Sequence, residues 1–170
     1  MASSLTLPDV LWEERIIVQG KEKACANGKK GLKFELSWEN LLCKHFGGNF
    51  RGFGDFFVGV SLLLDSSTKF VPLKGSDSDA VIGISSESVK TVKEDSGLID
   101  YFAKSDKGFF KNRVGGETLK KIEGALPNML ELYVSDLLGH PLTYDDARFS
   151  PEQCKMSILI VRTKKALPGK

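Results

Sequence analysis

The stretch Phe56-Phe-Val-Gly-Val-Ser-Leu-Leu-Leu64 decides the fold prediction, because it is the longest apolar run in the chain. Its aromatic and β-branched residues favour a buried strand. One face of such a strand is bulky throughout, whereas the other has the small residues Gly59 and Ser61 in its middle. A helix or another backbone can approach closely over small residues. We therefore predict that residues 56–64 form the central strand of a sheet.

Shorter segments on both sides of this run also have strand patterns. Residues 32–36 alternate apolar and polar side chains, and residues 156–161 form another buried apolar run. Residues 71–73 and 80–84 lie on either side of a turn rich in Gly, Ser and Asp, and Pro72 favours an edge position. We expect these segments to add strands to the sheet.

Helical spacing of apolar residues occurs in several other segments, namely residues 38–45, 96–102, 119–122 and 128–137. The last has the strongest pattern. Asn128 and Glu131 are placed almost as in a capping box, and Gly139 with Pro141 follows the end of the segment. We therefore predict that residues 128–137 form the strongest helix of the chain.

The order of these elements predicts an α+β fold. It consists of an antiparallel or mixed sheet of about five to seven strands with about three or four helices, mainly on one face. A β-sandwich with inserted helices is the alternative. The chain of 170 residues is long enough for one globular domain spanning residues 1–170, and we expect residues 1–10 and 164–170 to be loose termini.

Composition restricts the class of protein only weakly. The chain has a net charge of +2 and one local basic cluster, between residues 104 and 121. The first residues lack the pattern of a secretory signal, and no apolar run is long enough for a transmembrane helix. The three cysteines, Cys25, Cys43 and Cys154, are an odd and widely spaced set. These features favour an intracellular location, and the cytoplasm in particular.

Catalytic and metal-binding motifs are absent from the sequence. There is no nucleophile elbow, P-loop, His-Glu-x-x-His motif or dinucleotide fingerprint. The cysteines and the two histidines lack the spacing of a compact zinc site, so we expect no metal and no cofactor. One loop still gathers acid/base groups, namely His140, Tyr144, Asp145 and Asp146. This loop supports a small enzyme as an alternative function.

Two segments combine aromatic and basic side chains. The first places Phe50, Arg51 and Phe53 among glycines. The second contains Lys107, Phe109, Lys111 and Arg113. Flexible backbone, stacking faces and positive charge suit a surface that grips a peptide or stacks on the bases of single-stranded nucleic acid, RNA included.

We therefore predict a non-enzymatic binding or assembly module that uses this aromatic, glycine-rich and basic surface. The expected partner is a protein or a second copy of the chain in a homo-oligomer, and nucleic acid is the other candidate. Besides the small enzyme, a carrier of an apolar ligand, held in a cavity beside Gly59 and Ser61, remains an alternative.

Overall fold

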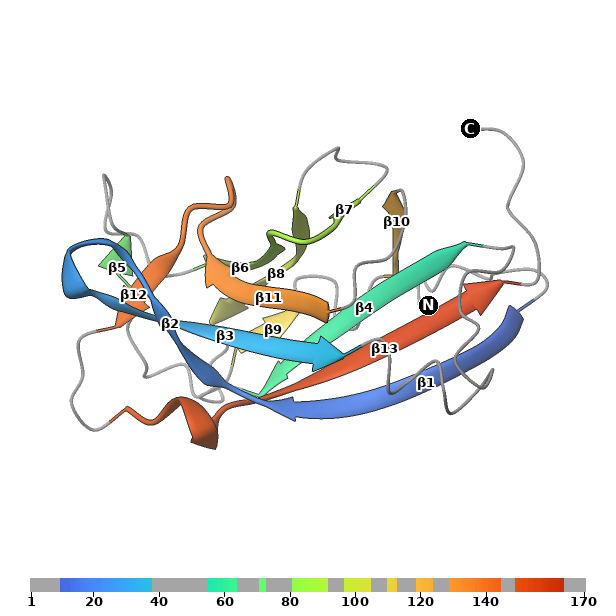
Figure 1. The fold of residues 1–170 in the computed structure, drawn as a ribbon, viewed down its shortest axis with the longest axis horizontal. Coiled ribbons are helices and arrows are strands. Elements are labelled where there is room, and N and C mark those ends of the chain that lie inside the picture. The colour runs from blue at the N-terminus through green and yellow to red at the C-terminus, as the bar shows by residue number, and fades with distance from the viewer. Residues whose placement is uncertain are drawn as a thin grey trace.

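The computed structural model of the chain describes residues 10–37, 55–63, 71–72, 81–91, 97–104, 110–112, 119–123, 129–144 and 149–163. Nearly all of these residues lie in antiparallel strands, which form two sheets (Figure 1). Within this part of the chain, the helical elements are two short 3-10 turns, η1 (Ala26–Gly28) and η2 (Pro151–Gln153).

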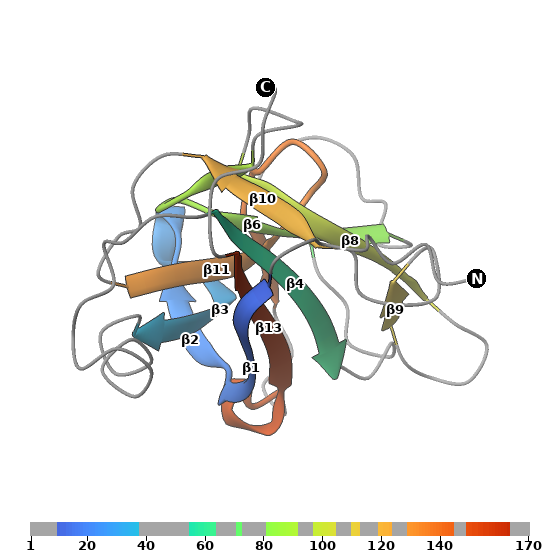
Figure 2. The same ribbon diagram turned by 90° about the vertical axis from the view of Figure 1, so that its right-hand side faces the viewer.

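The first sheet has five strands, and β4 occupies its middle position. In spatial order the strands are β1 (Val10–Gln19), β13 (Lys155–Thr163), β4 (Phe56–Leu63), β10 (Lys120–Glu123) and β7 (Lys90–Thr91). β10 runs alongside β4 (Figure 2).

The second sheet has eight strands. Its main order is β5 (Val71–Pro72), β12 (Leu142–Tyr144), β3 (Lys30–Ser37), β11 (Met129–Ser135), β6 (Val81–Ser86), β8 (Leu98–Lys104) and β9 (Phe110–Asn112). The remaining strand, β2 (Lys21–Ala24), pairs with β3.

The strand pairing is nested. When β2, β5, β7, β9 and β12 are set aside, the first remaining strand pairs with the last and the second with the second last, and the same rule continues inward. The pairs are β1 with β13, β3 with β11, β4 with β10, and β6 with β8. Two sheets built from four nested antiparallel pairs have the topology of a jelly roll.

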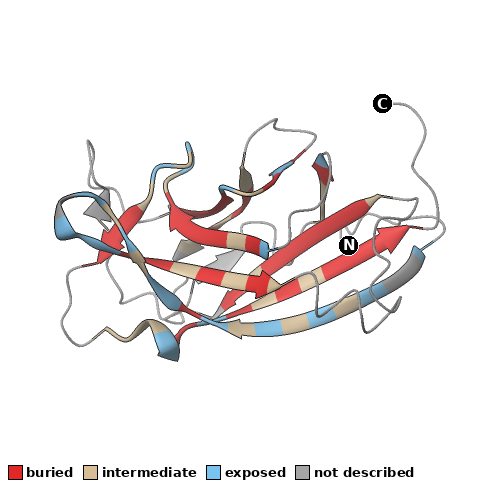
Figure 3. Ribbon diagram, viewed as in Figure 1, coloured by how far each residue is buried: buried red, intermediate tan, exposed pale blue. Residues whose placement is uncertain are grey.

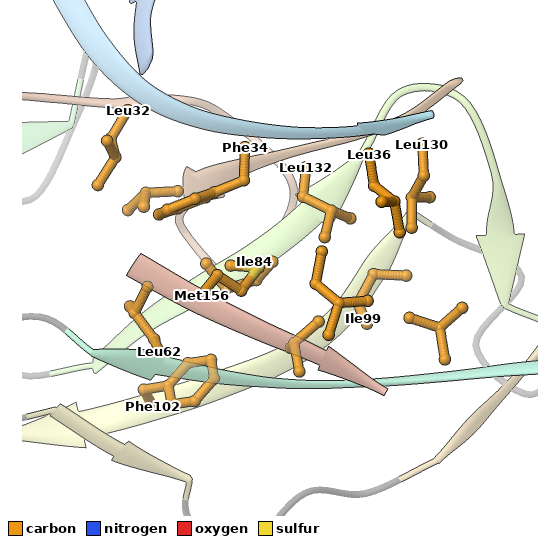
Figure 4. Packing of buried hydrophobic residues seen from close by; sticks show 14 of the residues in the cluster. Leu32, Phe34, Leu36, Leu62, Ile84, Ile99, Phe102, Leu130, Leu132 and Met156 are labelled. Carbon is orange, nitrogen blue, oxygen red and sulfur yellow. The ribbon is translucent and has the colours of Figure 1, made fainter. Parts of the chain in front are cut away.

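The hydrophobic core lies between the two sheets (Figure 4). Alternate residues of each strand point into it, because successive side chains of a strand face opposite sides of the sheet. The first sheet contributes the buried side chains of Val58, Val60, Leu62, Met156, Ile158 and Ile160; the second contributes those of Leu32, Phe34, Leu36, Ile82, Ile84, Leu130, Leu132 and Val134. Each such side chain stabilises the fold by about 1.5–3 kcal/mol.

The α+β prediction is wrong, because the predicted helices that can be compared are strands. Residues 98–102, 120–122 and 129–135 belong to β8, β10 and β11. β11 shows the reason: its core side chains Leu130, Leu132 and Val134 are at alternate positions, and β3 and β6 pair with its backbone on both sides. The inserted helices of the alternative sandwich are also missing from these segments. The predicted helix at residues 38–45 lies outside the described residues.

Several strand predictions are confirmed. The segment from Phe56 is a central strand, and strands occur as predicted around residues 32–36, 80–84 and 156–161. Pro72 lies in β5, at the end of its sheet. Residue 10, predicted to be part of a loose terminus, begins β1, and residues 1–9 and 164–170 lie outside the described residues.

Candidate functional site

Most of the predicted aromatic and basic surface falls outside the described residues. This holds for Phe50, Arg51, Phe53, Lys107, Phe109 and Arg113. Lys111 lies on the short strand β9, where its backbone is opposite Ala103 of β8. Whether the two segments share one surface therefore stays a prediction.

The two described residues of the predicted acid/base loop, His140 and Tyr144, lie at opposite ends of β12. Tyr144 is buried, its ring lies 4.4 Å from that of Phe149, and burial raises the pKa of its phenol. His140 is exposed and precedes the strand. Asp145 and Asp146 lie outside the described residues. The structure thus brings His140 together with a residue that we had not considered, Asp136, and the enzyme hypothesis remains untested.

Cys154 is a poor candidate for a nucleophile. Its thiol is buried, and burial raises its pKa to about 11. The thiolate, which is the reactive form, is therefore scarce at neutral pH. Burial also raises the pKa of the Cys25 thiol.

The face of β4 that carries Gly59 and Ser61 points away from the core. On it, Gly59 is opposite Leu159 and Ser61 is opposite Ser157 of β13. Gly59 is buried and Ser61 is half-buried. The carrier hypothesis, which needs a cavity over these residues, stays a prediction.

A turn at residues 136–140 is the best-defined candidate for an interaction site. It connects β11 to β12 and projects from the sheet (Figure 1). The side chain of Asp136 organises it: one carboxylate oxygen, Oδ1, accepts hydrogen bonds from the amides of Leu138 and His140, each at 2.8 Å. The other oxygen, Oδ2, lies 3.0 Å from Nδ1 of the His140 ring.

The backbone of the turn is closed by further hydrogen bonds. The amide of Asp136 donates to the carbonyl of His140 at 2.9 Å, and the amide of Gly139 donates to the carbonyl of Asp136 at 3.3 Å. Gly139 has φ of +92°, a conformation that side chains with a Cβ rarely adopt. The hydroxyl of Tyr133 donates to the carbonyl of Gly139 at 2.6 Å. The turn is therefore held at its tip and at its flank.

The base of the turn is fixed by the sheet. β3 pairs with the chain on both sides of the excursion, at Tyr133 opposite Lys33 and at Thr143 opposite Gly31. Below the turn, the Ser135 hydroxyl donates to the carbonyl of Asp136 at 2.7 Å and lies 2.7 Å from the hydroxyl of Ser85. Because a hydroxyl has a single proton, Ser85 is the donor in this pair.

Two leucines form the tip of this rigid turn. Leu138 is 83% exposed and Leu137 is 46% exposed. Apolar side chains gain free energy when they leave water, so such exposure on an ordered backbone offers a ready contact. The turn thus exposes two apolar side chains to solvent on an ordered backbone.

The electrostatics of the turn follow from its geometry. Partial burial raises the pKa of Asp136, but the hydrogen bonds from the amides of His140 and Leu138 and from the His140 ring outweigh it and hold the pKa below its usual value. The carboxylate is therefore ionised at neutral pH and can only accept hydrogen bonds. A neutral His140 ring must then carry its proton on Nδ1, which leaves Nε2 as an acceptor.

The edge strand β1 is a second candidate. Within the described part of the chain it pairs with β13 alone. Ile16 and Val18 pack against the core, whereas Ile17 on the opposite face is 61% exposed. Figure 3 shows the contrast between the mostly buried β4 and the half-buried and exposed residues of β1. Among the described residues, β1 thus has one partner strand only and carries an exposed apolar side chain.

Around β2 and β3, the described residues on the outer face of the second sheet carry paired charges. Glu35 contacts the ammonium groups of Lys21 at 2.9 Å and Lys33 at 3.1 Å, and hydrogen bonds from both lower its pKa. Lys23 pairs with Glu87 at 3.5 Å. Such a mosaic gives little net attraction for a nucleic-acid backbone.

Comparisons with known proteins add no relative. No protein-family model, no curated protein and no solved structure matches this chain. The described residues contain no group of three or more His, Cys, Asp or Glu side chains arranged to hold a metal. In the same part of the chain, no helix has the length and apolar character needed to cross a bilayer.

Sequence reasoning missed β1 and identified only His140 of the turn, although the turn had a usable signal. Asp136 and Gly139 stand three residues apart, and Asp at the first and Gly at the fourth position are typical of a type I turn. The predicted helix over residues 128–137 concealed this pattern.

Proposed function

We propose that the protein is a non-enzymatic assembly module whose partner is a second copy of the same chain. The observation that carries the proposal is β1, a strand of ten residues at the edge of the five-stranded sheet. The jelly-roll topology by itself does not select a function, because capsid subunits, lectins and cupins all use it. The argument therefore rests on β1.

Within the described residues, β1 lacks several of the usual protections of an edge strand, although it carries the charged side chains of Glu13, Glu14 and Arg15. An exposed edge is a template for another strand, and natural proteins guard such edges with lysine, proline or very short strands. The sequence of β1, VLWEERIIVQ, contains neither lysine nor proline. Its one irregularity lies at its start, between Val10 and Trp12. Residues 13–19 therefore offer a regular edge for pairing.

The side chains of β1 are self-complementary in an antiparallel pair. If a two-fold axis passes through Ile17, the Ile17 residues of the two copies face each other and cover the exposed apolar surface. Ile16 of each copy then lies opposite Val18 of the other, and Arg15 lies opposite Gln19. β-Branched cross-strand pairs of this kind each contribute about 0.2–1 kcal/mol, and this register opposes no like charges at these positions. Such an isologous contact closes into a dimer.

Sedimentation velocity and native mass spectrometry test the proposal. We expect the wild-type chain to form a reversible dimer of twice 18.7 kDa. Ile17→Lys places two lysines at the axis and should shift the equilibrium to the monomer. Met129→Lys is the matched control, since Met129 is also an exposed apolar residue but lies on β11. A wild-type monomer at the highest soluble concentration would exclude the dimer.

A cross-linking experiment tests the register. Directly opposed residues of an antiparallel pair bring their Cβ atoms close enough for a disulfide. Ile17→Cys should therefore give a covalent dimer under oxidising conditions, whereas Arg15→Cys, on the same face of β1, should not. Equal cross-linking at both positions would contradict the proposed axis.

The aromatic and basic segments remain part of this proposal as a further contact surface for a partner inside the cell. They comprise Phe50, Arg51, Phe53, Lys107, Phe109, Lys111 and Arg113. If they serve binding, Phe53→Ala should weaken association and leave the melting temperature nearly unchanged. A large loss of stability would instead indicate that Phe53 belongs to the core.

A further inference from the structure

β1 occupies a well-defined place on its own chain. Among the described strands it pairs with β13 alone, and this antiparallel pairing is regular over residues 13–19. Two side chains of β1, Ile16 and Val18, also pack against the core. A second copy of the chain has the same place for a strand of this sequence, because its β13 and its core are identical.

The chain passes from the first sheet to the second at a single residue, Gly20. β1 lies in the first sheet and β2 in the second, and Gly20 is the one residue between them. Its amide donates a hydrogen bond to the carbonyl of Cys154 at 2.9 Å. A Cβ at this position would lie 2.5 Å from the carbonyl oxygen of Pro151 and 2.7 Å from a methyl group of Leu32. The connection between the two sheets is therefore short and tightly packed.

A connection of this kind favours the exchange of strands between copies. When a hinge straightens, the segment beyond it leaves its own chain and takes the same place on a second copy. The contacts of the segment are conserved, so the balance between the two forms depends on the hinge and on the protein concentration. Straightening at Gly20 would join β1 and β2 into one continuous strand and would relieve the close approach to Pro151 and Leu32.

We propose that two copies of the chain exchange β1, so that β1 of each copy pairs with β13 of the other. Each copy gives one strand and receives one, so the product is a closed dimer. This inference rests on the proposed function, because it uses the same strand and the same partner, a second copy. It differs in the edge that is used. The exchanged dimer uses the edge of β1 that faces β13, whereas the dimer proposed above uses the opposite edge.

The exchange should be slow once the chain has folded. The pairing with β13 extends over most of β1, and its hydrogen bonds must break before the strand can leave. The exchanged dimer should therefore form when unfolded chains refold together at high protein concentration. It should form poorly when chains that have already folded are mixed.

Disulfide trapping between two different chains tests the proposal. Arg15 of β1 lies opposite Leu159 of β13, and directly opposed residues bring their Cβ atoms close enough for a disulfide. Arg15→Cys chains and Leu159→Cys chains are unfolded together in urea, refolded together at high concentration and oxidised. We expect a covalent heterodimer, and peptide mass mapping should show that its disulfide joins positions 15 and 159. Chains that keep their own β1 and pair through its opposite edge hold these two positions apart.

Three controls accompany this experiment. A single chain with both Arg15→Cys and Leu159→Cys should close the disulfide within itself when it refolds at low concentration. If it does not fold or close, Glu13→Cys and Val161→Cys form a second opposed pair. The two single variants, refolded separately and then mixed, should give little heterodimer. The wild-type chain, treated in the same way, reveals any cross-link through its native cysteines.

A substitution at Gly20 tests the role of the hinge. Gly20→Ala, introduced into both single-cysteine chains, should raise the ratio of exchanged to unexchanged chains by about tenfold, because its methyl group is crowded in the unexchanged chain only. Gly31→Ala is the matched control. Its Cβ would lie 2.9 Å from the carbonyl oxygen of Leu142, which is a similar clash outside the hinge, and the ratio should not change. Circular dichroism confirms that each variant folds.

The outcomes separate this proposal from the dimer proposed above. Ile17→Lys in both chains should leave the yield of heterodimer unchanged, because Ile17 is at the axis of the other dimer only. Three results would overturn the exchange. They are the lack of a covalent heterodimer although the double variant closes its own disulfide, an equal yield from chains that were folded before mixing, and equal effects of Gly20→Ala and Gly31→Ala. A reversible wild-type dimer without the heterodimer would leave the edge-paired dimer standing alone.

Discussion

The turn at residues 136–140 and the edge of β1 both expose apolar side chains, but they offer a partner different things. The turn uses much of its backbone in hydrogen bonds with Asp136, Ser135 and Tyr133, and it exposes the side chains of Leu137 and Leu138. β1 presents the backbone of an edge strand with Ile17 beside it. The main chain at a strand edge can pair with strands of many sequences. Apolar side chains on an ordered turn need a pocket of matching shape. The two regions thus differ in what they expose, which is the main chain of an edge strand in β1 and apolar side chains in the turn.

The largest loss of stability is expected when a buried side chain is shortened in β13, the strand that pairs with β1. Ile158 of β13 is fully buried and lies opposite Ile16 of β1. Ile158→Ala should lower the free energy of unfolding by about 2–5 kcal/mol, because it leaves a cavity in the core. Urea denaturation followed by circular dichroism measures this loss. A change below about 1 kcal/mol would mean that the core collapses around the site.

A smaller loss of stability is expected when a side chain is added at Gly83, at the base of the turn. A Cβ on Gly83 would lie 2.8 Å from the carbonyl oxygen of Asp136 and 2.9 Å from a methyl group of Leu98. Gly83→Ala must therefore displace the base of the turn, and we expect a loss of about 1–3 kcal/mol in the same assay. Gly28→Ala is a control for added bulk, since nothing lies within 4 Å of its Cβ position, although its φ of +73° adds local strain. Equal losses at the two glycines would argue against the close contact.

The carboxylate that orders the turn should matter less for global stability than for local order. Asp136→Ala removes hydrogen bonds to the amides of Leu138 and His140, and we expect a loss of about 1–2 kcal/mol. The amides of Leu138 and His140 should exchange with solvent faster, while those of Ile16 and Val18 in β1 stay unchanged. Hydrogen exchange followed by NMR measures both. Unchanged exchange in the turn would show that the carboxylate does not hold it.

The same carboxylate predicts a pH dependence of the turn. The pKa of Asp136 is lower in the folded chain than in the unfolded one. Its contribution is therefore complete above the unfolded pKa of about 3.9 and disappears as the pH falls through the folded pKa. Amide shifts of Leu138 should report this transition below about pH 4, and Asp136→Asn should abolish it. A transition that persists in Asp136→Asn would have another source.

The smallest expected effect on stability is at Ile17. Its side chain is mostly in water, so Ile17→Ser should change the free energy of unfolding of the monomer by about 0.5 kcal/mol or less. Association should nevertheless weaken. Urea denaturation at low protein concentration, compared with sedimentation at high concentration, separates the two quantities. A large loss of monomer stability would mean that Ile17 supports the fold.

The sequence predicted the strands whose apolar pattern allows one interpretation. Phe56 to Leu63 is apolar on both faces and short, which suits a buried strand. The segment around β11 allowed two interpretations, because Met129, Leu132 and Tyr133 fit helical spacing while Leu130, Leu132 and Val134 fit alternation. The flanking strands β3 and β6 decide between them by pairing with the backbone. Their positions are set by residues far away in the sequence.

The candidate site was predicted only in part, for a related reason. His140 was recognised, but it was grouped with Tyr144, Asp145 and Asp146, because these follow it in one polar segment. Its observed partner, Asp136, stood inside the predicted helix, where a turn could not form. β1 was not predicted at all, since Glu13, Glu14 and Arg15 interrupt its apolar pattern and conceal the strand. The wrong helix prediction for residues 128–137 thus concealed the contact between Asp136 and His140.

The nested pairing of the strands also has a consequence for the time course of folding. β1 and β13 are adjacent in space, with Val10 opposite Thr163, yet nearly the whole described chain separates them in sequence. Pairs that close such long loops form late, because the entropy of loop closure must be overcome first. During synthesis, the strand that we propose as the dimer edge therefore leaves the ribosome long before its partner within the chain. Until β13 is synthesised, β1 lacks the strand with which it pairs in the folded chain. Nascent chains can then associate prematurely through β1.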